Sequence, residues 1–198
     1  MKSIATTVLC AAALAIGASP ATAGSGVGVG DAAPAFTLTD SAGQEVSLAD
    51  FKGKVVVLEW VNPDCPFVQR HYKAGTMKDL AAEYAPKGVV WLAINSTNYM
   101  DAQANAKFKA ANDLAYPILV DQSGEVGHLY GAMTTPHLFI IDSEGMVVYM
   151  GAIDDDPRGS KSGSTVNYVS AALDQVLAGE AVTVSETKPY GCSVKYKK

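Results

Sequence analysis

The pattern of apolar and polar residues predicts a series of short strands separated by helices. Two stretches, residues 54–60 and 89–94, are near-continuous apolar runs rich in β-branched side chains, which is typical of strands buried on both faces. Further strands are predicted at residues 35–39, 116–120, 137–141 and 146–150. Helices are predicted at residues 66–84, 101–112, 125–130 and 165–178.

This alternation of strands and helices predicts one α/β domain over residues 31–180, with parallel strands in the middle of its sheet. The turn at residues 142–145 predicts an antiparallel hairpin, so the sheet is expected to be mixed. The glycine-rich residues 24–30 are expected to form a flexible lead-in, and residues 181–198 are expected to form an irregular C-terminal tail that carries Cys192.

The N-terminus has the pattern of a secretory signal peptide. Lys2 precedes an apolar core from Val8 to Ala18, and Ala21-Thr22-Ala23 has the small-x-small pattern of a cleavage site. The core is too short to anchor the chain in a bilayer, and no later segment is apolar enough to span one. We therefore expect residues 1–23 to be removed and the mature chain to be secreted across the inner membrane, into the periplasm or the extracellular space.

The chain has 198 residues, of which 48% are hydrophobic and 18% charged, and its net charge is −5. This composition is typical of a globular protein, and the acidic balance gives no electrostatic basis for binding nucleic acid. Three cysteines are too few for a disulfide framework, and cleavage of the signal peptide would leave only Cys65 and Cys192. No glycine-rich phosphate-binding loop precedes a predicted helix, so no cofactor is expected.

Cys65 lies where a buried strand is predicted to end and a helix to begin, with Pro66 at the first helical position. The unpaired N–H groups and the positive dipole end of a helix N-terminus stabilise a thiolate, which is the nucleophilic form of cysteine. Cys65 is therefore the candidate reactive residue. The alternative, a structural thiol packed as a small apolar side chain, stays open at this point.

Residues 57–68, which surround Cys65, resemble the active-site corner of the thioredoxin superfamily, and Thr134-Thr135-Pro136 resembles its cis-proline loop. More closely, the chain resembles the redoxin or peroxiredoxin-like group, related to the AhpC/TSA and TlpA-type proteins. That group shares a Cys-Pro-Phe-Val corner, a His-Tyr pair (here His71-Tyr72) and a C-terminal stretch (here residues 188–196). The resemblance implies a thioredoxin-like three-layer sandwich with a peroxiredoxin-style N-terminal extension.

The chain departs from this pattern at positions that bear on activity. Val68 stands where thioredoxins have the second cysteine of Cys-x-x-Cys, and Leu58 and Asn62 stand where peroxidatic sites have Pro and either Thr or Ser. Such sites also place an arginine over the thiolate, and Arg70 and Arg158 are the only arginines here. The resemblance thus implies an antioxidant or thiol–disulfide oxidoreductase, whose substrate is a peroxide or a protein or small-molecule disulfide and whose reductant is an external thiol.

The resemblance also implies roles for residues around Cys65. Thr135 and Pro136 are expected opposite the cysteine, with backbone free to pair with an extended substrate segment, and Pro66 is expected to contact the substrate as well. Glu59, six residues before Cys65, has the spacing of the buried acid that relays protons in thioredoxins. Alternatively, Glu59 faces solvent or pairs with a nearby lysine.

Cys192 has two interpretations that the sequence leaves open. It is expected to resolve a mixed disulfide or a sulfenic acid on Cys65, or to form a disulfide with it. If the tail does not reach Cys65, Cys192 is instead a free thiol or a bridge between two chains.

Two non-enzymatic functions remain as alternatives. The first is a thioredoxin-fold binding module that holds peptides at the Thr135-Pro136 edge. The second is copper handling by Cys65, Cys192 and the histidines; no pair of these residues has the spacing of metal ligands, so no metal site is predicted.

Overall fold

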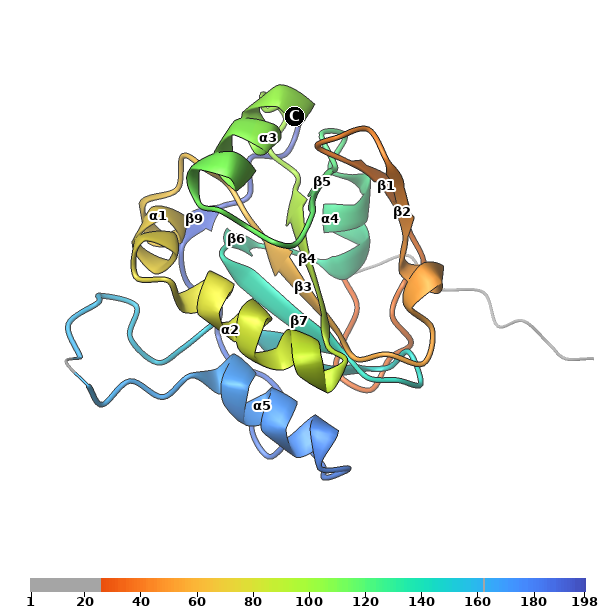
Figure 1. Cartoon of the computed structure of the whole chain (residues 1–198), viewed down its shortest axis with the longest axis vertical. Helices are drawn as coiled ribbons and strands as arrows, with labels where there is room; N and C mark the ends of the chain where they lie inside the picture. The colour runs from red at the N-terminus through yellow and green to blue at the C-terminus, as the bar shows by residue number, and fades with distance from the viewer. Residues whose placement is uncertain (1–25, 162) are drawn as a thin grey trace, which may run out of the picture.

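A mixed sheet forms the middle layer of the fold. The computed structural model describes residues 26–161 and 163–198, so the predicted signal peptide lies outside the described residues. Seven strands form the main sheet in the order β2-β1-β5-β4-β3-β7-β8, and β6 pairs with β9 in a separate two-stranded sheet (Figure 1). The strands β3, β4 and β5 run parallel, whereas β7 is antiparallel to both β3 and β8. The predicted α/β class with a mixed sheet is confirmed.

The elements follow the predicted order. The strands are β1 (Thr37–Asp40), β2 (Glu45–Ser47), β3 (Val56–Trp60), β4 (Val90–Asn95), β5 (Ile118–Val120), β6 (Thr134–Thr135), β7 (His137–Ile141), β8 (Val147–Gly151) and β9 (Cys192–Ser193). The helices are α1 (Pro66–Lys73), α2 (Thr76–Tyr84), α3 (Ala102–Ala111), α4 (Glu125–Tyr130) and α5 (Tyr168–Leu177), and the 3-10 helices are η1 (Leu48–Phe51) and η2 (Ala85–Lys87).

Two apolar cores lie on opposite faces of the sheet. One is shared with α1, α2 and α5 and contains Val57, Met77 and Leu173; the other is shared with α4 and contains Leu58 and Tyr130. Successive residues of β3 therefore supply both cores, because side chains alternate across a strand. Every residue of β3 is buried, so the strand that leads to Cys65 is held from both sides. Among the described residues, no helix is long and apolar enough to cross a membrane.

The single helix predicted over residues 66–84 is wrong, because the chain breaks there into α1 and α2. Gly75 precedes α2 with a φ of 78°, in the left-handed region that glycine adopts without strain. Met77 and Tyr84 of α2 are fully buried, so the second helix is positioned by its own contacts with the sheet. As a result, α1 is a short helix whose N-terminus carries Cys65.

The segments on either side of the predicted domain pack against it. Val27 is buried, and the backbone N–H of Gly30 donates to the carbonyl of Val147, so the described part of the lead-in runs along β8. The C-terminal tail was predicted to be irregular; most of it is, but Cys192 and Ser193 form β9 beside β6 (Figure 1). This pairing brings the C-terminal tail beside the segment that precedes β7.

Glu59 is the one charged residue within β3, and it is completely buried. Its carboxyl group accepts hydrogen bonds from the hydroxyl of Tyr72 and the indole N–H of Trp91, each at 2.9 Å. The structure therefore agrees with the buried alternative and not with a solvent-facing Glu59. Burial raises the pKa of Glu59 from 4.5 to about 7, and the two hydrogen bonds oppose that rise only in part.

This raised pKa predicts a pH-dependent cost to stability that Glu59→Gln removes. Below pH 4.5 the carboxyl group is protonated in both the folded and unfolded states. As pH rises from 4.5 to about 7, ionisation of Glu59 in the unfolded chain lowers the free energy of unfolding, by about 3 kcal/mol in total. Urea unfolding at several pH values should show this decline in the wild type and its absence in Glu59→Gln. Glu45→Gln, at an exposed carboxylate, is the matched control and should keep the wild-type slope.

Candidate active site

Cys65 caps the N-terminus of α1, as predicted, and Pro66 occupies the first position of the helix. The backbone N–H of Cys65 donates to the carbonyl of Asn62 at 2.9 Å, and this turn joins β3 to the helix. The thiol donates to the carbonyl oxygen of Thr135, with Sγ and O 2.9 Å apart. Cys65 is only 1% exposed. The fold thus holds its sulfur between a helix N-terminus and β6.

Thr135 and Pro136 lie opposite Cys65, as the resemblance implied, and the bond between them is cis. The hydroxyl of Thr135 is buried and has no hydrogen-bond partner among the described residues. A buried hydroxyl without a partner calls for an explanation. The nearby sulfur supplies one, because the hydroxyl can donate to Cys65 once that residue is a thiolate.

The tail brings Cys192 to the same place. In the antiparallel pair of β6 and β9, Cys192 lies directly opposite Thr135, and Ser193 lies opposite Thr134. The two thiols are neighbours, and no disulfide joins them in this structure. The expectation that the Thr135 backbone is free to pair with a substrate is wrong in this structure, because β9 occupies that edge.

The two thiols differ in acidity. Burial acts to raise the pKa of Cys65, but hydrogen bonds from Cys192, from Thr135 and from the backbone N–H of Val68 outweigh it, so the pKa lies below its ordinary value. Burial and, to a lesser extent, the adjacent Cys65 together raise the pKa of Cys192 to about 11. Of the two thiols, Cys65 is therefore the one that loses its proton first.

Gly191 makes the approach of the tail possible. Its φ is 144°, a conformation that L side chains rarely adopt, and a Cβ at this position would collide with the carbonyl of Thr135. The residue before Cys192 therefore has to be glycine for the backbone to come this close. The sequence Tyr190-Gly191-Cys192 is a local signal of this contact that the sequence analysis did not use.

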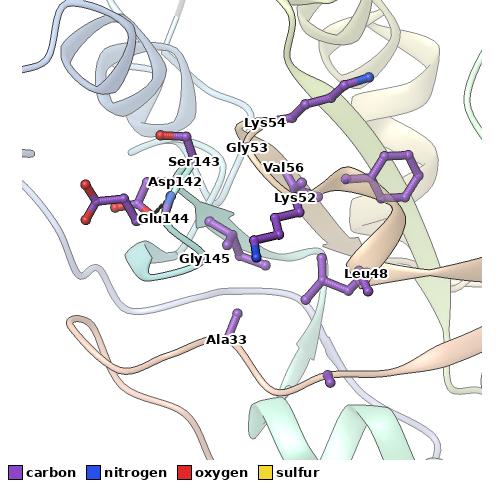
Figure 2. Close-up of a pocket in the computed structure, with 14 residues that line it drawn as sticks. Ala33, Leu48, Lys52, Gly53, Lys54, Val56, Asp142, Ser143, Glu144 and Gly145 are labelled. Carbon is purple, nitrogen blue, oxygen red and sulfur yellow. Dashed lines mark hydrogen bonds between the residues drawn. The ribbon is translucent and has the colours of Figure 1, made fainter.

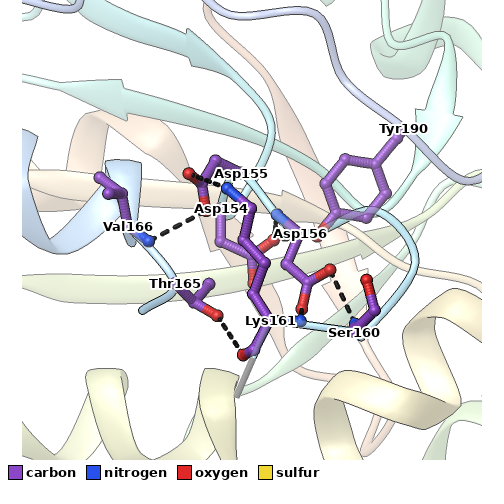
Figure 3. A network of polar contacts seen from close by, with 8 residues as sticks. All are labelled: Asp154, Asp155, Asp156, Ser160, Lys161, Thr165, Val166 and Tyr190. Atoms are coloured by element: carbon purple, nitrogen blue, oxygen red, sulfur yellow. Dashed lines mark hydrogen bonds and ion pairs between the residues drawn. The ribbon is translucent and has the colours of Figure 1, made fainter. Parts of the chain in front are cut away.

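Polar contacts hold the tail just before Cys192. The hydroxyl of Tyr190 donates to the carboxylate of Asp154, and both residues are drawn in Figure 3. The same hydroxyl lies 3.0 Å from Nε2 of His71, which is buried on α1. The guanidinium of Arg70 donates to the carbonyls of Asp156 and Pro157, at 3.0 Å each. The His-Tyr pair of the sequence motif thus contributes its histidine to anchoring the tail.

Further contacts hold the tail just after Cys192. The backbone N–H of Val194 donates to the carbonyl of Met133 at 3.0 Å. The ring of Tyr196 stacks on His128 with centroids 3.9 Å apart, and its hydroxyl donates to the carbonyl of Ala132 at 2.7 Å. Asn98 binds the carbonyl of Lys195 through both its backbone and its side-chain N–H groups. Cys192 is therefore fixed from both sides.

Glu59 does not reach the two sulfurs. Its hydrogen bonds lead to Trp91 and Tyr72, and the hydroxyl of Tyr116 donates in turn to that of Tyr72 at 3.1 Å. None of these side chains has a hydrogen bond to Cys65 or Cys192 in the described part of the chain. The proton-relay role of Glu59 consequently stays a prediction.

The acidic loop after β8 is held together by its own contacts. The carboxylate of Asp156 accepts the backbone N–H groups of Ser160 and Lys161, and Asp155 pairs with the Lys161 side chain (Figure 3). Within residues 26–161 and 163–198, no three His, Cys, Asp or Glu side chains gather as metal ligands.

A separate cavity of about 370 Å³ lies at the other end of β3. It is lined by η1, by the residues that lead into Val56, and by the turn between β7 and β8, with Lys52 and Glu144 among its polar groups (Figure 2). None of the residues predicted to act at the site lines this cavity, so it is separate from the site around Cys65.

Comparison with known proteins places this geometry in a family. A sequence model of the AhpC/TSA family matches residues 29–150. The thiol-disulfide oxidoreductase ResA of Bacillus thuringiensis is 33% identical over 120 residues, which cover 61% of this chain and 67% of that protein.

Solved structures agree with that assignment. A hypothetical protein from Sinorhizobium meliloti is 30% identical with a TM-score of 0.79, and the match covers 86% of this chain and 96% of that one. A secreted disulfide oxidoreductase from Mycobacterium tuberculosis is 25% identical with a TM-score of 0.50, over 57% of this chain and 79% of that one. The fold is thus thioredoxin-like, as predicted, and the chain belongs to the AhpC/TSA family.

Proposed function

We propose that the chain is an exported thiol–disulfide oxidoreductase whose redox centre is the pair Cys65 and Cys192. The observation that carries the proposal is the placement of Cys192 opposite Thr135, beside the Cys65 thiol. The pair replaces the Cys-x-x-Cys motif, in which both cysteines belong to one helical turn. Here the second cysteine comes from the tail, and Val68 occupies its usual place.

The reaction is an exchange of two electrons between this pair and an external partner. When the two sulfurs join, the dithiol loses two protons and two electrons, and a partner disulfide is reduced to two thiols. In the reverse direction, two partner thiols are oxidised and the pair returns to the dithiol. The similarity to ResA and to the mycobacterial disulfide oxidoreductase supports this reaction type.

Disulfide exchange fits the site better than peroxide reduction. A peroxidatic site needs a cation over the thiolate, and the Arg70 guanidinium is instead bound to the carbonyls of Asp156 and Pro157. Arg70 therefore serves the loop that anchors the tail. A non-enzymatic peptide-binding module is also disfavoured, because β9 already occupies the Thr135 edge.

Export is supported by the sequence and by one relative. Residues 1–23 have the pattern of a signal peptide, and the mycobacterial relative is a secreted protein. An oxidising compartment is where a two-cysteine centre meets disulfides and exported thiols. Its partners are proposed to be protein or small-molecule disulfides and external thiols.

Serine substitution of either cysteine tests the redox centre. Cys65→Ser and Cys192→Ser should each lower catalysed disulfide formation in a reduced two-cysteine peptide by at least about a hundredfold, because each removes one sulfur of the pair. Ser193→Ala, at the exposed neighbour on β9, should leave the rate unchanged. Near-wild-type turnover in both cysteine variants would contradict the proposal. Peroxide consumption that depends on Cys65 but not on Cys192 would point to a peroxidase instead.

Thr135→Val tests the thiolate environment with almost no change in side-chain volume. Valine removes the buried hydroxyl that donates to the Cys65 thiolate, so the pKa of Cys65 should rise toward its ordinary value. Alkylation of Cys65 near neutral pH should then slow roughly threefold, since the lost thiolate is partly offset by greater nucleophilicity. Mass spectrometry of the Cys65 tryptic peptide across pH measures this. Thr134→Val is the matched control, and an equal effect there would argue against a specific contact.

A further inference from the structure

The cysteine with the lower pKa is not the one that is more exposed to solvent. Cys65 has the lowered pKa but is only 1% exposed. Cys192 has the raised pKa but is partly exposed, and its neighbour Ser193 is exposed. The sulfur best suited to be a thiolate is thus the one that an external molecule reaches least.

Cys65 is covered by elements of the fold itself. Helix α1 and the Thr135 carbonyl contact the residue on two sides, and β9 lies across the edge that would otherwise receive an extended partner. The anchors at Tyr190 and Tyr196 hold β9 on both sides of Cys192. By contrast, no further strand pairs with β9 among the described residues, so its outer edge is left open.

Because disulfide exchange needs direct access to the attacked sulfur, the difference in exposure decides which cysteine an external thiolate attacks. A thiolate attacks a disulfide in line with the S–S bond, from the side opposite the departing sulfur, and access decides which sulfur reacts. Cys65 belongs to the buried core that also contains Val68 and Leu138, so an external thiolate has little access to its sulfur. Cys192 also packs against this core, but it is only half-buried, which leaves it the more accessible of the two cysteines.

Resting on the proposed function above, we propose that external partners exchange with this protein at Cys192, the more exposed cysteine, and that Cys65 serves as the internal partner. This differs from the expectation drawn from the resemblance, in which Cys65 attacks the substrate and Cys192 resolves. The substrate class is a thiol on a small molecule or a flexible segment, because the partner has to reach a half-buried cysteine.

Oxidation of a partner then proceeds in two balanced steps. A partner thiolate attacks Sγ of Cys192, the Cys65–Cys192 bond breaks, and its electron pair leaves on Cys65 as a thiolate. A second partner thiolate attacks the partner sulfur of the mixed disulfide, which yields a partner disulfide and releases Cys192, and Cys192 takes up a proton. The hydrogen bonds around Cys65 assist the first step, because a stabilised thiolate is the better leaving group.

Trapping the mixed disulfide identifies the attacked sulfur. The full chain with Cys10→Ser, so that Cys65 and Cys192 are its only cysteines, is oxidised with diamide and desalted. It is then mixed briefly with glutathione, quenched with acid and alkylated with N-ethylmaleimide. The two cysteines fall on different tryptic peptides, so mass spectrometry reads each one separately.

We expect glutathione on Cys192 and maleimide on Cys65, in at least about tenfold excess over the reverse arrangement. Glutathione mainly on Cys65 would overturn this inference and leave the proposed redox pair intact. No mixed disulfide on either cysteine, with the Cys65–Cys192 bond unreacted, would overturn the proposed function together with the inference.

A second measurement tests access without depending on acidity. Cys65→Ser and Cys192→Ser, each in the Cys10→Ser chain, leave one cysteine to react with either N-ethylmaleimide or a bulky polyethylene glycol maleimide. The ratio of the two rates cancels the thiolate fraction. This bulky-to-small ratio should be at least about tenfold lower when Cys65 is the remaining cysteine. Equal ratios would overturn the inference, because they would show that Cys65 is as open as Cys192.

Discussion

The backbone pairing of Thr135 with Cys192 is the contact on which the proposed redox site depends. Without it, Cys65 is a single thiol at a helix N-terminus, with no second sulfur in its own helix because Val68 stands in that position. With it, two sulfurs are neighbours and can form one bond. A two-residue strand is a weak element by itself, so the pairing relies on the anchors at Tyr190 and Tyr196.

The same contact leaves the low thiol pKa on Cys65 and the greater exposure to solvent on Cys192, although one cysteine often has both properties. Burial penalises a thiolate at either position, so the difference between the two sulfurs comes from their hydrogen-bond donors. Cys65 receives donors from the first turn of α1, from Thr135 and from the tail. Cys192 lies at the edge of a two-stranded sheet and has the nearby Lys195 as its favourable charge. The lower pKa therefore belongs to Cys65, at the N-terminus of α1, whereas the greater exposure belongs to Cys192, in the tail.

The sequence was sufficient for the parts of the site that depend on local structure. The strand-to-helix corner at Cys65, the Thr135-Pro136 connection and the mixed α/β sheet all have periodic or spacing signals, and the structure has them where they were expected. The break at Gly75 was missed because an apolar helical pattern continues through it. The pairing of Cys192 was left open because a two-residue strand has no periodicity, and its partner lies far away in the sequence.

Because β9 supplies the second sulfur, this active site has an order of assembly. All seven strands of the main sheet and Cys65 are encoded before residue 152, whereas Cys192 follows only after α5 and the anchoring segment. During synthesis the chain therefore passes through a stage with a complete sheet and a single reactive-corner thiol. Such a nascent chain cannot form the Cys65–Cys192 disulfide, and its Cys65 is left without the cover of β9. Completion of the proposed redox centre is thus tied to docking of the segment that carries β9.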